Sequence, residues 1–189
     1  GTMTYAAGTT AGSFQGIAFT ATASSSASNT HNITNNTISN IQWTSTAAST
    51  FYGINSTIAN TTTGAILNIT GNTVQNMTFV TSTSTMTGIV TGYAPTTNIT
   101  NNTVNNLTRS GSSTLYGIQY TGTSSTTYNI SGNTISNISN TNTTSSSSLY
   151  GLYSGASPAT ENIYNNTIDG ITGSSTSSLT VYGIYSTTA

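Results

Sequence analysis

An eleven-residue phrase recurs five times along the chain and restricts the folds that the chain can adopt. Its copies are NITNNTISNIQ from Asn32, NITGNTVQNMT from Asn68, NITNNTVNNLT from Asn98, NISGNTISNIS from Asn129 and NIYNNTIDGIT from Asn162. Successive copies begin 36, 30, 31 and 33 residues apart, so the period drifts while the apolar positions within the phrase stay fixed. This combination predicts a solenoid, in which each repeat is one supersecondary unit and neighbouring repeats bury its apolar face.

A second phrase stands between copies of the first: an apolar residue, a variable residue, Gly, and Ile or Leu. Its copies are FQGI at Phe14, FYGI at Phe51, MTGI at Met86, LYGI at Leu115, LYGL at Leu149 and VYGI at Val181. Both apolar positions are expected to face the core, which strict alternation along a strand would not allow. We therefore expect the Gly to mark a bulge or a corner, because Gly tolerates bends that other residues resist.

The composition of the phrases favours strands over helices. Thr, Ile, Val and Tyr favour strands, and no apolar stripe of helical period is sustained. In the first copy Ile33, Ile38 and Ile41 are expected to point inward, with a turn at Asn35 and Asn36. The equivalent inward sets are Ile69, Val74 and Met77; Ile99, Val104 and Leu107; Ile130, Ile135 and Ile138; and Ile163, Ile168 and Ile171. With the second phrase, each rung then has three short strands and about five core side chains.

The pattern G-I-x-x followed by N-I-x-[NG]-N-T-[IV]-x-N-[IVLM] resembles the right-handed parallel β-helix repeat. The Thr/Ser-rich loop before Tyr-Gly-Ile-Tyr is similar to repeats in large secreted surface proteins of Bacteroidota-type bacteria. The resemblance covers nearly the whole chain and implies an all-β, right-handed parallel β-helix (β-solenoid) of about six rungs of ~32 residues. It leaves the function open, since that fold hosts lyases, hydrolases, tailspikes, adhesins and passive spacers.

The continuous repeat indicates a single β-solenoid domain over residues 1–189. Aligning Gly16 with Gly117 places the start of the chain in mid-rung, and the last Gly-Ile strand is followed by only a few residues. No amphipathic helix or polar repeat is expected to cap either end, although solenoids normally need caps. We therefore expect either a segment of a longer β-helix or head-to-tail stacking of copies, a contact that does not close and so makes a filament.

Charged residues make up only 2% of the chain, and the net charge is −1. This excludes the electrostatic footprint of a nucleic-acid-binding protein. No stretch approaches the ~20 apolar residues of a membrane span, so no membrane insertion is expected. Such scarcity of charge is unusual for a cytoplasmic protein. We therefore expect an extracellular, secreted protein of the cell surface with a structural or adhesive function.

One asparagine position at the turn of the first phrase is filled in every copy, by Asn36, Asn72, Asn102, Asn133 and Asn166. Stacked rungs lie ~4.8 Å apart, so identical amides can form hydrogen bonds in a ladder along the axis. Ligand binding is the alternative. We favour the internal ladder, because buried amides need such partners.

Tyrosines recur at two positions of the second phrase: Tyr52, Tyr116, Tyr150 and Tyr182 precede the Gly, and Tyr153 and Tyr185 follow it. Facing outward, they would form an aromatic stripe able to stack on sugar rings or on a neighbouring molecule. In the alternative interpretation they only cover strand edges and the bases of loops, and Gln15 and Thr87 interrupt the stripe. The second functional hypothesis is therefore a carbohydrate-binding adhesin whose partners are glycans or cell-surface polysaccharide.

Groups for catalysis are scarce. The carboxylates are Glu161 and Asp169, expected at different corners, and Arg109 is expected in a loop about two rungs earlier. His31 and Asp169 would lie about four rungs, or roughly 19 Å, apart. Lyases and hydrolases of this fold use clustered carboxylates with Arg or Lys. We therefore expect neither enzyme activity nor a cofactor, and without cysteine there is no Cys-based metal site.

Two further interpretations receive less support. Glycosylation sequons are dense, but a chain rich in Asn and Thr generates them by composition, and several fall in predicted strands. Ice binding requires Thr in register on one strand face, whereas the runs TSTST and TNTT fall mainly in predicted loops of unequal length.

Overall fold

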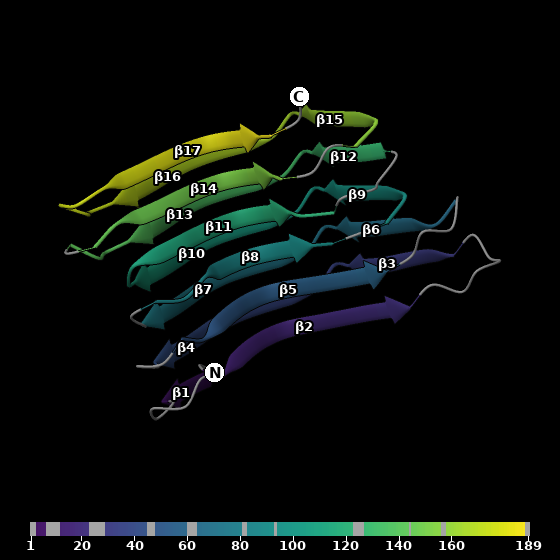
Figure 1. Ribbon diagram of the computed structural model, residues 1–189. Helices are drawn as coiled ribbons and strands as arrows, with labels where there is room; N and C mark the ends of the chain where they lie inside the picture. Colours follow the sequence, from purple (N-terminus) through teal and green to yellow (C-terminus); the bar gives the residue numbers. More distant parts are fainter. Residues whose placement is uncertain are drawn as a thin grey trace.

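The computed structural model describes residues 3–6, 12–22, 29–44, 48–59, 64–80, 83–92, 94–122, 127–143, 145–155 and 158–187. These residues form strands β1 to β17 in three parallel sheets, and no helix occurs among them (Figure 1). In each turn the chain passes once through each of the three sheets, and the turns stack in sequence order. The prediction of an all-β parallel solenoid with three strands per rung is therefore confirmed.

Sheet A contains β1 (Met3–Ala6), β4 (Thr37–Thr44), β7 (Thr73–Val80), β10 (Thr103–Ser110), β13 (Thr134–Asn140) and β16 (Thr167–Gly173). Sheet B contains β2 (Ser13–Thr22), β5 (Thr50–Ala59), β8 (Met86–Thr91), β11 (Ser113–Tyr120), β14 (Ser147–Ser154) and β17 (Leu179–Ser186). Sheet C contains β3 (Thr30–Thr34), β6 (Ile66–Thr70), β9 (Thr96–Thr100), β12 (Thr127–Ser131) and β15 (Thr160–Tyr164). The described chain thus makes five complete turns after the partial turn of β1 and β2.

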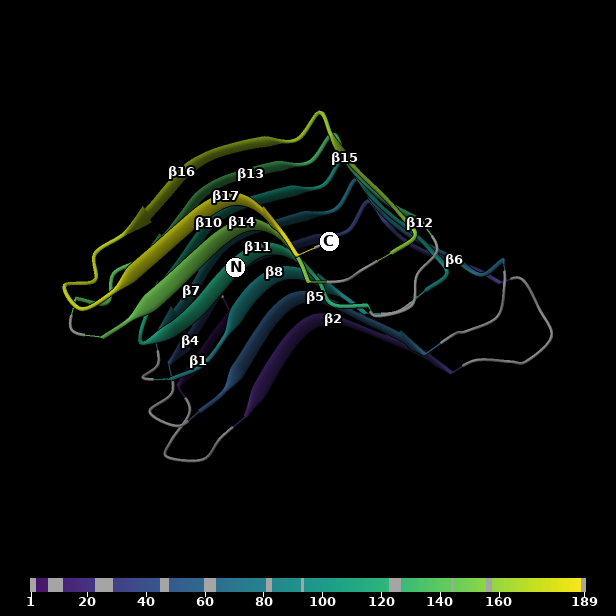
Figure 2. The ribbon, with the colours of Figure 1, turned by 45° about the horizontal axis from the view of Figure 1, so that its top comes forward.

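The eleven-residue phrase builds one strand of sheet C, a turn, and most of a strand of sheet A. Equivalent residues lie directly above one another, as Asn32 does with Asn68 and Ile33 with Ile69. Sheets A and B arch over one side of the molecule and sheet C lies on the other (Figure 2). The fixed spacing within the phrase therefore keeps the same residue in the same column through all rungs.

The [NG] position of the phrase has a left-handed backbone, with φ between 52° and 67° at Asn35, Gly71, Asn101, Gly132 and Asn165. Asn and Gly tolerate this conformation better than other residues, which explains why the position alternates between them. A second left-handed column interrupts the strands of sheet A, with φ between 52° and 63° at Asn40, Asn76, Asn106, Asn137 and Gly170. This irregularity lets two apolar residues three positions apart both face the core.

The glycines of the second phrase serve close approach, which corrects the expectation that they serve bending. None of them has a left-handed φ. A Cβ atom on Gly117 would lie 2.5 Å from Cγ2 of Ile135 in sheet A and 2.6 Å from the carbonyl oxygen of Gly151 in the next rung. Sheets A and B therefore approach each other so closely that a methyl group does not fit.

The apolar core runs along the axis and contains the inward sets expected from the sequence. In the central rungs Val104, Leu107, Leu115 and Ile118 are fully buried. At the outer edge of β17, in contrast, Val181 is 42% and Ile184 is 49% exposed, because no described strand covers them. The expected core thus continues to an open surface at this end of the molecule.

Arg109 corrects a second expectation. It lies within β10, not in a loop, and its side chain is fully buried. Its column in sheet A contains Trp43, Phe79 and Asn140, which are also buried. This inward column adds to each central rung a core side chain that was not predicted from the sequence.

Candidate functional site

The ladder of inner asparagines predicted from the sequence is present. Asn36, Asn72, Asn102 and Asn133 each donate from Nδ2 to Oδ1 of the asparagine in the following rung, at distances of 2.9–3.0 Å. The backbone N–H of each also donates to that same Oδ1 atom. Every Oδ1 atom along the ladder from Asn72 onward therefore accepts two hydrogen bonds.

A third set of bonds ties the inner ladder to sheet C. Nδ2 of Asn102 donates to the carbonyl oxygen of Ile69 at 2.8 Å, and Nδ2 of Asn133 donates equally to Ile99. Asn72, Asn102 and Asn133 are buried and use both amide hydrogens and the oxygen in this way. Because these protein groups satisfy the buried amides, the ladder holds the turn in place and offers no free group to a ligand.

A second ladder runs along the outside of sheet C. Asn68, Asn98, Asn129 and Asn162 each donate from Nδ2 to Oδ1 of the preceding asparagine in the column, at 2.7–2.8 Å. The donors of this ladder point toward β3, whereas those of the inner ladder point toward β15. The two ladders therefore run in opposite directions along the axis. This asparagine begins every copy of the repeat phrase, but its hydrogen bonds along the axis were not predicted from the sequence.

The two ends of the solenoid leave complementary groups on these ladders. At one end, no described residue accepts from the backbone N–H of Asn166, and its Nδ2 donates only to the carbonyl oxygens of Ile130 and Tyr164. At the other end, no described residue donates to Oδ1 of Asn36. In the outer ladder the polarity is reversed: no described residue accepts from Nδ2 of Asn32 or donates to Oδ1 of Asn162. Each end therefore offers the donor or acceptor that the opposite end lacks.

Five of the six predicted tyrosines form one cluster on the outer face of sheet B. The rings of Tyr116, Tyr150 and Tyr182 stack with centroids 5.1 and 5.5 Å apart, and those of Tyr153 and Tyr185 stack at 5.5 Å. The two columns meet edge to face, as between Tyr150 and Tyr153. Tyr52 stands apart, because the buried Thr87 lies between it and Tyr116. We call the five clustered residues the tyrosine face.

The stacking geometry limits what the tyrosine face can bind. Neighbouring rings in a column are nearly parallel, at 16° and 15°, and their centroids are closer than the width of a ring. Their faces therefore overlap along the axis, so the ring edges are more open to solvent than the ring faces. Burial raises the pKa of the Tyr52, Tyr116 and Tyr150 hydroxyl groups above its usual value of 10.0. Tyr116 and Tyr150 of the tyrosine face thus present neutral hydroxyl groups at neutral pH.

The titratable groups do not converge. Glu161 lies in β15, where it accepts hydrogen bonds from the hydroxyl groups of Ser154 and Ser186, while Asp169 lies in β16 of another sheet. His31 lies in β3 at the other end, with its ring against Phe19. Within the described ranges, no group of three or more His, Asp or Glu side chains could hold a metal ion.

No described helix is long and apolar enough to cross a membrane.

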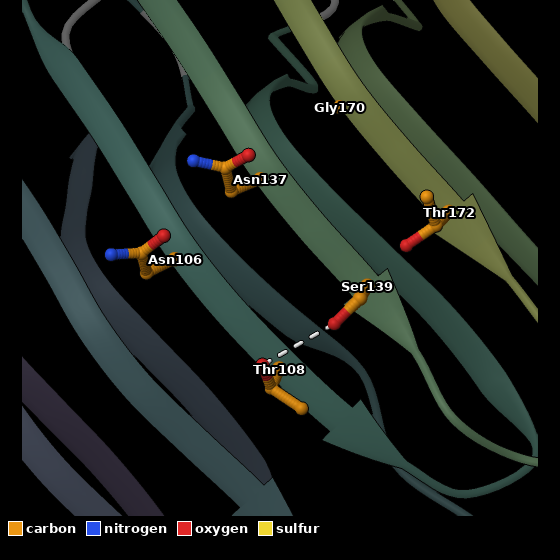
Figure 3. Close-up of a pocket in the computed structure, with 6 residues that line it drawn as sticks. All are labelled: Asn106, Thr108, Asn137, Ser139, Gly170 and Thr172. Carbon is orange, nitrogen blue, oxygen red and sulfur yellow. Dashed lines mark hydrogen bonds between the residues drawn. The ribbon is translucent and has the colours of Figure 1, made fainter.

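A shallow hollow lies on the outer face of sheet A, with a volume of about 410 Å³. Asn106, Asn137 and Gly170 line one side of it, and Thr108, Ser139 and Thr172 line the other (Figure 3). The hydroxyl groups of Thr108 and Ser139, in neighbouring rungs, form a hydrogen bond of 3.3 Å. The lining is uncharged and repeats from rung to rung, so it has the character of a regular solenoid surface.

Comparisons of the chain with family models, with curated proteins and with solved structures found no match.

Proposed function

We propose that this chain is an extracellular structural or adhesive β-solenoid that assembles end to end into a surface filament or stalk. The observation that carries the proposal is the complementarity of its two ends. In a head-to-tail stack, β17 of one copy would pair with β2 of the next and β16 with β1, so the open edges of sheets A and B would cover each other; Asn162 and Asn166 would not contact Asn32 and Asn36, because β15 and β3 would lie two strand positions apart. All strand pairs within the chain are parallel, so a further rung extends each sheet without reversing it.

The apolar surfaces of the two ends support the same assembly. Leu179, Val181 and Ile184 are exposed at the outer edge of β17, at 40%, 42% and 49%. Phe14 and Ile17 of β2, at the opposite end of sheet B, lie in the same columns as Val181 and Ile184. Pairing β17 with β2 of a second copy would place these apolar side chains against each other and cover two open strand edges.

The scarcity of charge supports an extracellular structural function. Only 2% of the residues are charged, so little electrostatic repulsion opposes contact between copies. Stability then depends on the apolar core, the strand ladders and the asparagine ladders. None of these requires a ligand or a cofactor.

Electron microscopy of the purified protein tests the proposal. Six rungs at ~4.8 Å predict fibres with a rung repeat near that value and a longer period of roughly 29 Å per copy. Single short rods at all concentrations would count against end-to-end assembly.

A second candidate function is carbohydrate binding at the tyrosine face, favoured by the clustering of five part-exposed tyrosines on one surface. Because the ring edges are more open to solvent than the ring faces, hydrogen bonds from hydroxyl groups would contribute more than stacking on sugar rings. Replacing Tyr116, Tyr150 and Tyr182 with Ser should then abolish retention on polysaccharide while sparing assembly. The matched Phe variant keeps the rings and separates loss of the hydroxyl groups from loss of the surface. Unchanged retention by the Ser variant would remove this candidate.

A further inference from the structure

The tyrosine face is a cluster of oxidisable side chains at the surface of the molecule. Tyr116 and Tyr150 are part-exposed there, in the middle of sheet B. The chain has no cysteine, and its single tryptophan, Trp43, is 7% exposed. Met77 and Met86, two of the three methionines, are fully buried. An oxidant in solution therefore meets the phenol rings of this cluster without competition from a thiol or from Trp43.

Tyr116 and Tyr150 have the relative geometry that ring coupling requires. They occupy one column of sheet B in neighbouring rungs, with ring centroids 5.1 Å apart and an interplanar angle of 16°. When a phenol loses a hydrogen atom, the unpaired electron occupies the π system, whose lobes stand on the two ring faces. Stacked rings present these lobes to each other, whereas edge-to-face rings, such as Tyr150 and Tyr153 at 76°, do not.

We propose that Tyr116 and Tyr150 form an oxidative cross-linking site, at which hydrogen peroxide and a haem peroxidase join the two rings as dityrosine. The oxidant takes one hydrogen atom from each phenol O–H group and leaves two tyrosyl radicals. The radicals pair to form one carbon–carbon bond between Cε atoms, each ortho to a hydroxyl group. The hydrogen on each of these carbons then leaves as a proton, and each phenol oxygen takes up a proton. One hydrogen peroxide is reduced to two water molecules for each cross-link.

The backbone around the pair fixes the spacing of the two rings. Leu115 and Leu149, which precede the two tyrosines, are fully buried and lie opposite each other in the register of β11 and β14. On the other side, a Cβ atom on Gly117 would lie only 2.6 Å from the carbonyl oxygen of the glycine that follows Tyr150. The strands are therefore anchored on both sides of the pair, and coupling requires movement only of the outer ends of the rings.

The rest of the tyrosine face brings oxidation to this pair. Tyr150 contacts every other ring of the cluster, with centroids 5.1–5.6 Å apart. A radical formed on any of these rings can therefore pass to Tyr150 by transfer between rings in contact. Among its stacked neighbours Tyr116 is the nearer, at 5.1 Å against 5.5 Å for Tyr182. Tyr52 stands outside this network, because Thr87 separates it from Tyr116.

The cross-link would join two neighbouring rungs covalently. Tyr116 and Tyr150 lie 34 positions apart in the sequence (150 − 116 = 34), so the new bond closes a loop that contains one whole turn of the coil. A covalent loop of this kind restricts the unfolded chain, as a disulfide does. The chain has no cysteine for a disulfide, so coupled tyrosines would supply the staple that its composition otherwise lacks.

A variant with Tyr153→Phe, Tyr182→Phe and Tyr185→Phe tests the inference, because it leaves Tyr116 and Tyr150 as the one stacked pair of the tyrosine face. Hydrogen peroxide and a haem peroxidase are added at low protein concentration, and dityrosine fluorescence is measured on the single-chain band of a denaturing gel. The matched control carries Tyr116→Phe in addition. We expect at least about tenfold less single-chain dityrosine in the control, because the stacked pair is held in a reactive orientation. Equal yields would overturn the inference.

The same reaction in concentrated urea shows whether the fold is required. Unfolding separates the two rings, so the single-chain product of the triple Phe variant should fall to the level of the control. An undiminished yield in urea, or products found only between chains, would overturn the inference. The site lies within one chain and does not depend on the proposed stacking of copies. Cross-linking in copies that never form fibres would therefore support the site and contradict the stacking, and fibres without cross-linking would do the reverse.

Discussion

The Oδ1 atom of Asn102 accepts two hydrogen bonds from Asn72, one from its Nδ2 at 3.0 Å and one from its backbone N–H at 2.9 Å. The same relationship holds between successive inner asparagines along the solenoid. A short polar side chain with one acceptor and two donors satisfies a buried turn in both axial directions. The recurrence of Asn at this position thus has a physical cause that is independent of any ligand.

Replacing Asn102 with Ala should destabilise the fold strongly. The change removes bonds to Asn72, Asn133 and Ile69 at a site that is 1% exposed, so the free energy of unfolding should fall by on the order of 3 kcal/mol. Asn98→Ala is the matched control in the outer ladder, where solvent can replace the lost bonds, and we expect about 0.5–1 kcal/mol. Urea denaturation measures both. Equal losses of unfolding free energy would show that the inner ladder stabilises the fold no more than the outer ladder does.

Replacing Gly117 with Ala should also destabilise the protein. The new Cβ atom would lie 2.6 Å from a backbone oxygen, which cannot move without shifting the next rung, so we expect a loss of about 3 kcal/mol. Gly92→Ala serves as the control, because its Cβ atom would meet Ser56 O at 3.7 Å, an ordinary contact distance. Thermal unfolding followed by circular dichroism compares the two variants. A Gly117 variant as stable as the control would contradict the close approach of sheets A and B.

Replacing Arg109 with Met should stabilise the protein at neutral pH. Arg109 is fully buried and donates from Nη1 to the carbonyl oxygen of Thr114, and no ion pair to it occurs among the described residues. Burial lowers its pKa to about 10, well below the usual value of an arginine, so the charged form is disfavoured in the folded state. Below pH 10 the charge is present in both states and the penalty is complete; the penalty is relieved as the pH rises above about 10, where the folded state loses its proton before the unfolded state does.

We expect a gain of about 1–3 kcal/mol for the Met variant, which keeps the apolar stem and removes the charge. Urea denaturation at neutral pH measures it, with Arg109→Lys as the control that retains the charge. A lower midpoint for the Met variant would mean that the contacts of the guanidinium outweigh its desolvation.

Alkaline pH should weaken the fold through the tyrosines. Burial raises the pKa of Tyr116 and Tyr150 above 10.0 in the folded state, so these residues ionise more readily when the chain is unfolded. Their contribution to stability is therefore complete below pH 10 and is lost as the pH rises through their folded-state pKa values. The variant with Phe at both positions should lose less stability between about pH 8 and pH 11 than the wild type. Arg109 is present in both proteins, so its opposite effect cancels in the comparison. An equal loss of stability in the two proteins over this pH range would contradict the raised pKa of Tyr116 and Tyr150.

Much of the fold could be predicted from the sequence because the repeat phrase fixes the columns. Ile33, Ile69 and Ile99 occupy one position of the phrase and one column of the core. The inner asparagines also share one position of the phrase and lie in one column. Burial of Arg109 could not be predicted, since its column contains Trp43, Phe79 and Asn140, which share neither size nor polarity. Overlap of the tyrosine rings was also out of reach, because it depends on rotamers and not on spacing.

The most direct test of end-to-end assembly is sedimentation velocity of the Gly183→Ala variant beside the wild type. Within one chain the new Cβ atom meets only Ile168, at 4.0 Å, so the free energy of unfolding should change by less than about 0.5 kcal/mol. In a stack it would collide with the next rung, as a Cβ atom on Gly151 would with the carbonyl oxygen of Gly183 at 2.6 Å. We predict fast-sedimenting polymers for the wild type and single copies for the variant. Polymers of equal size from both proteins would contradict the account.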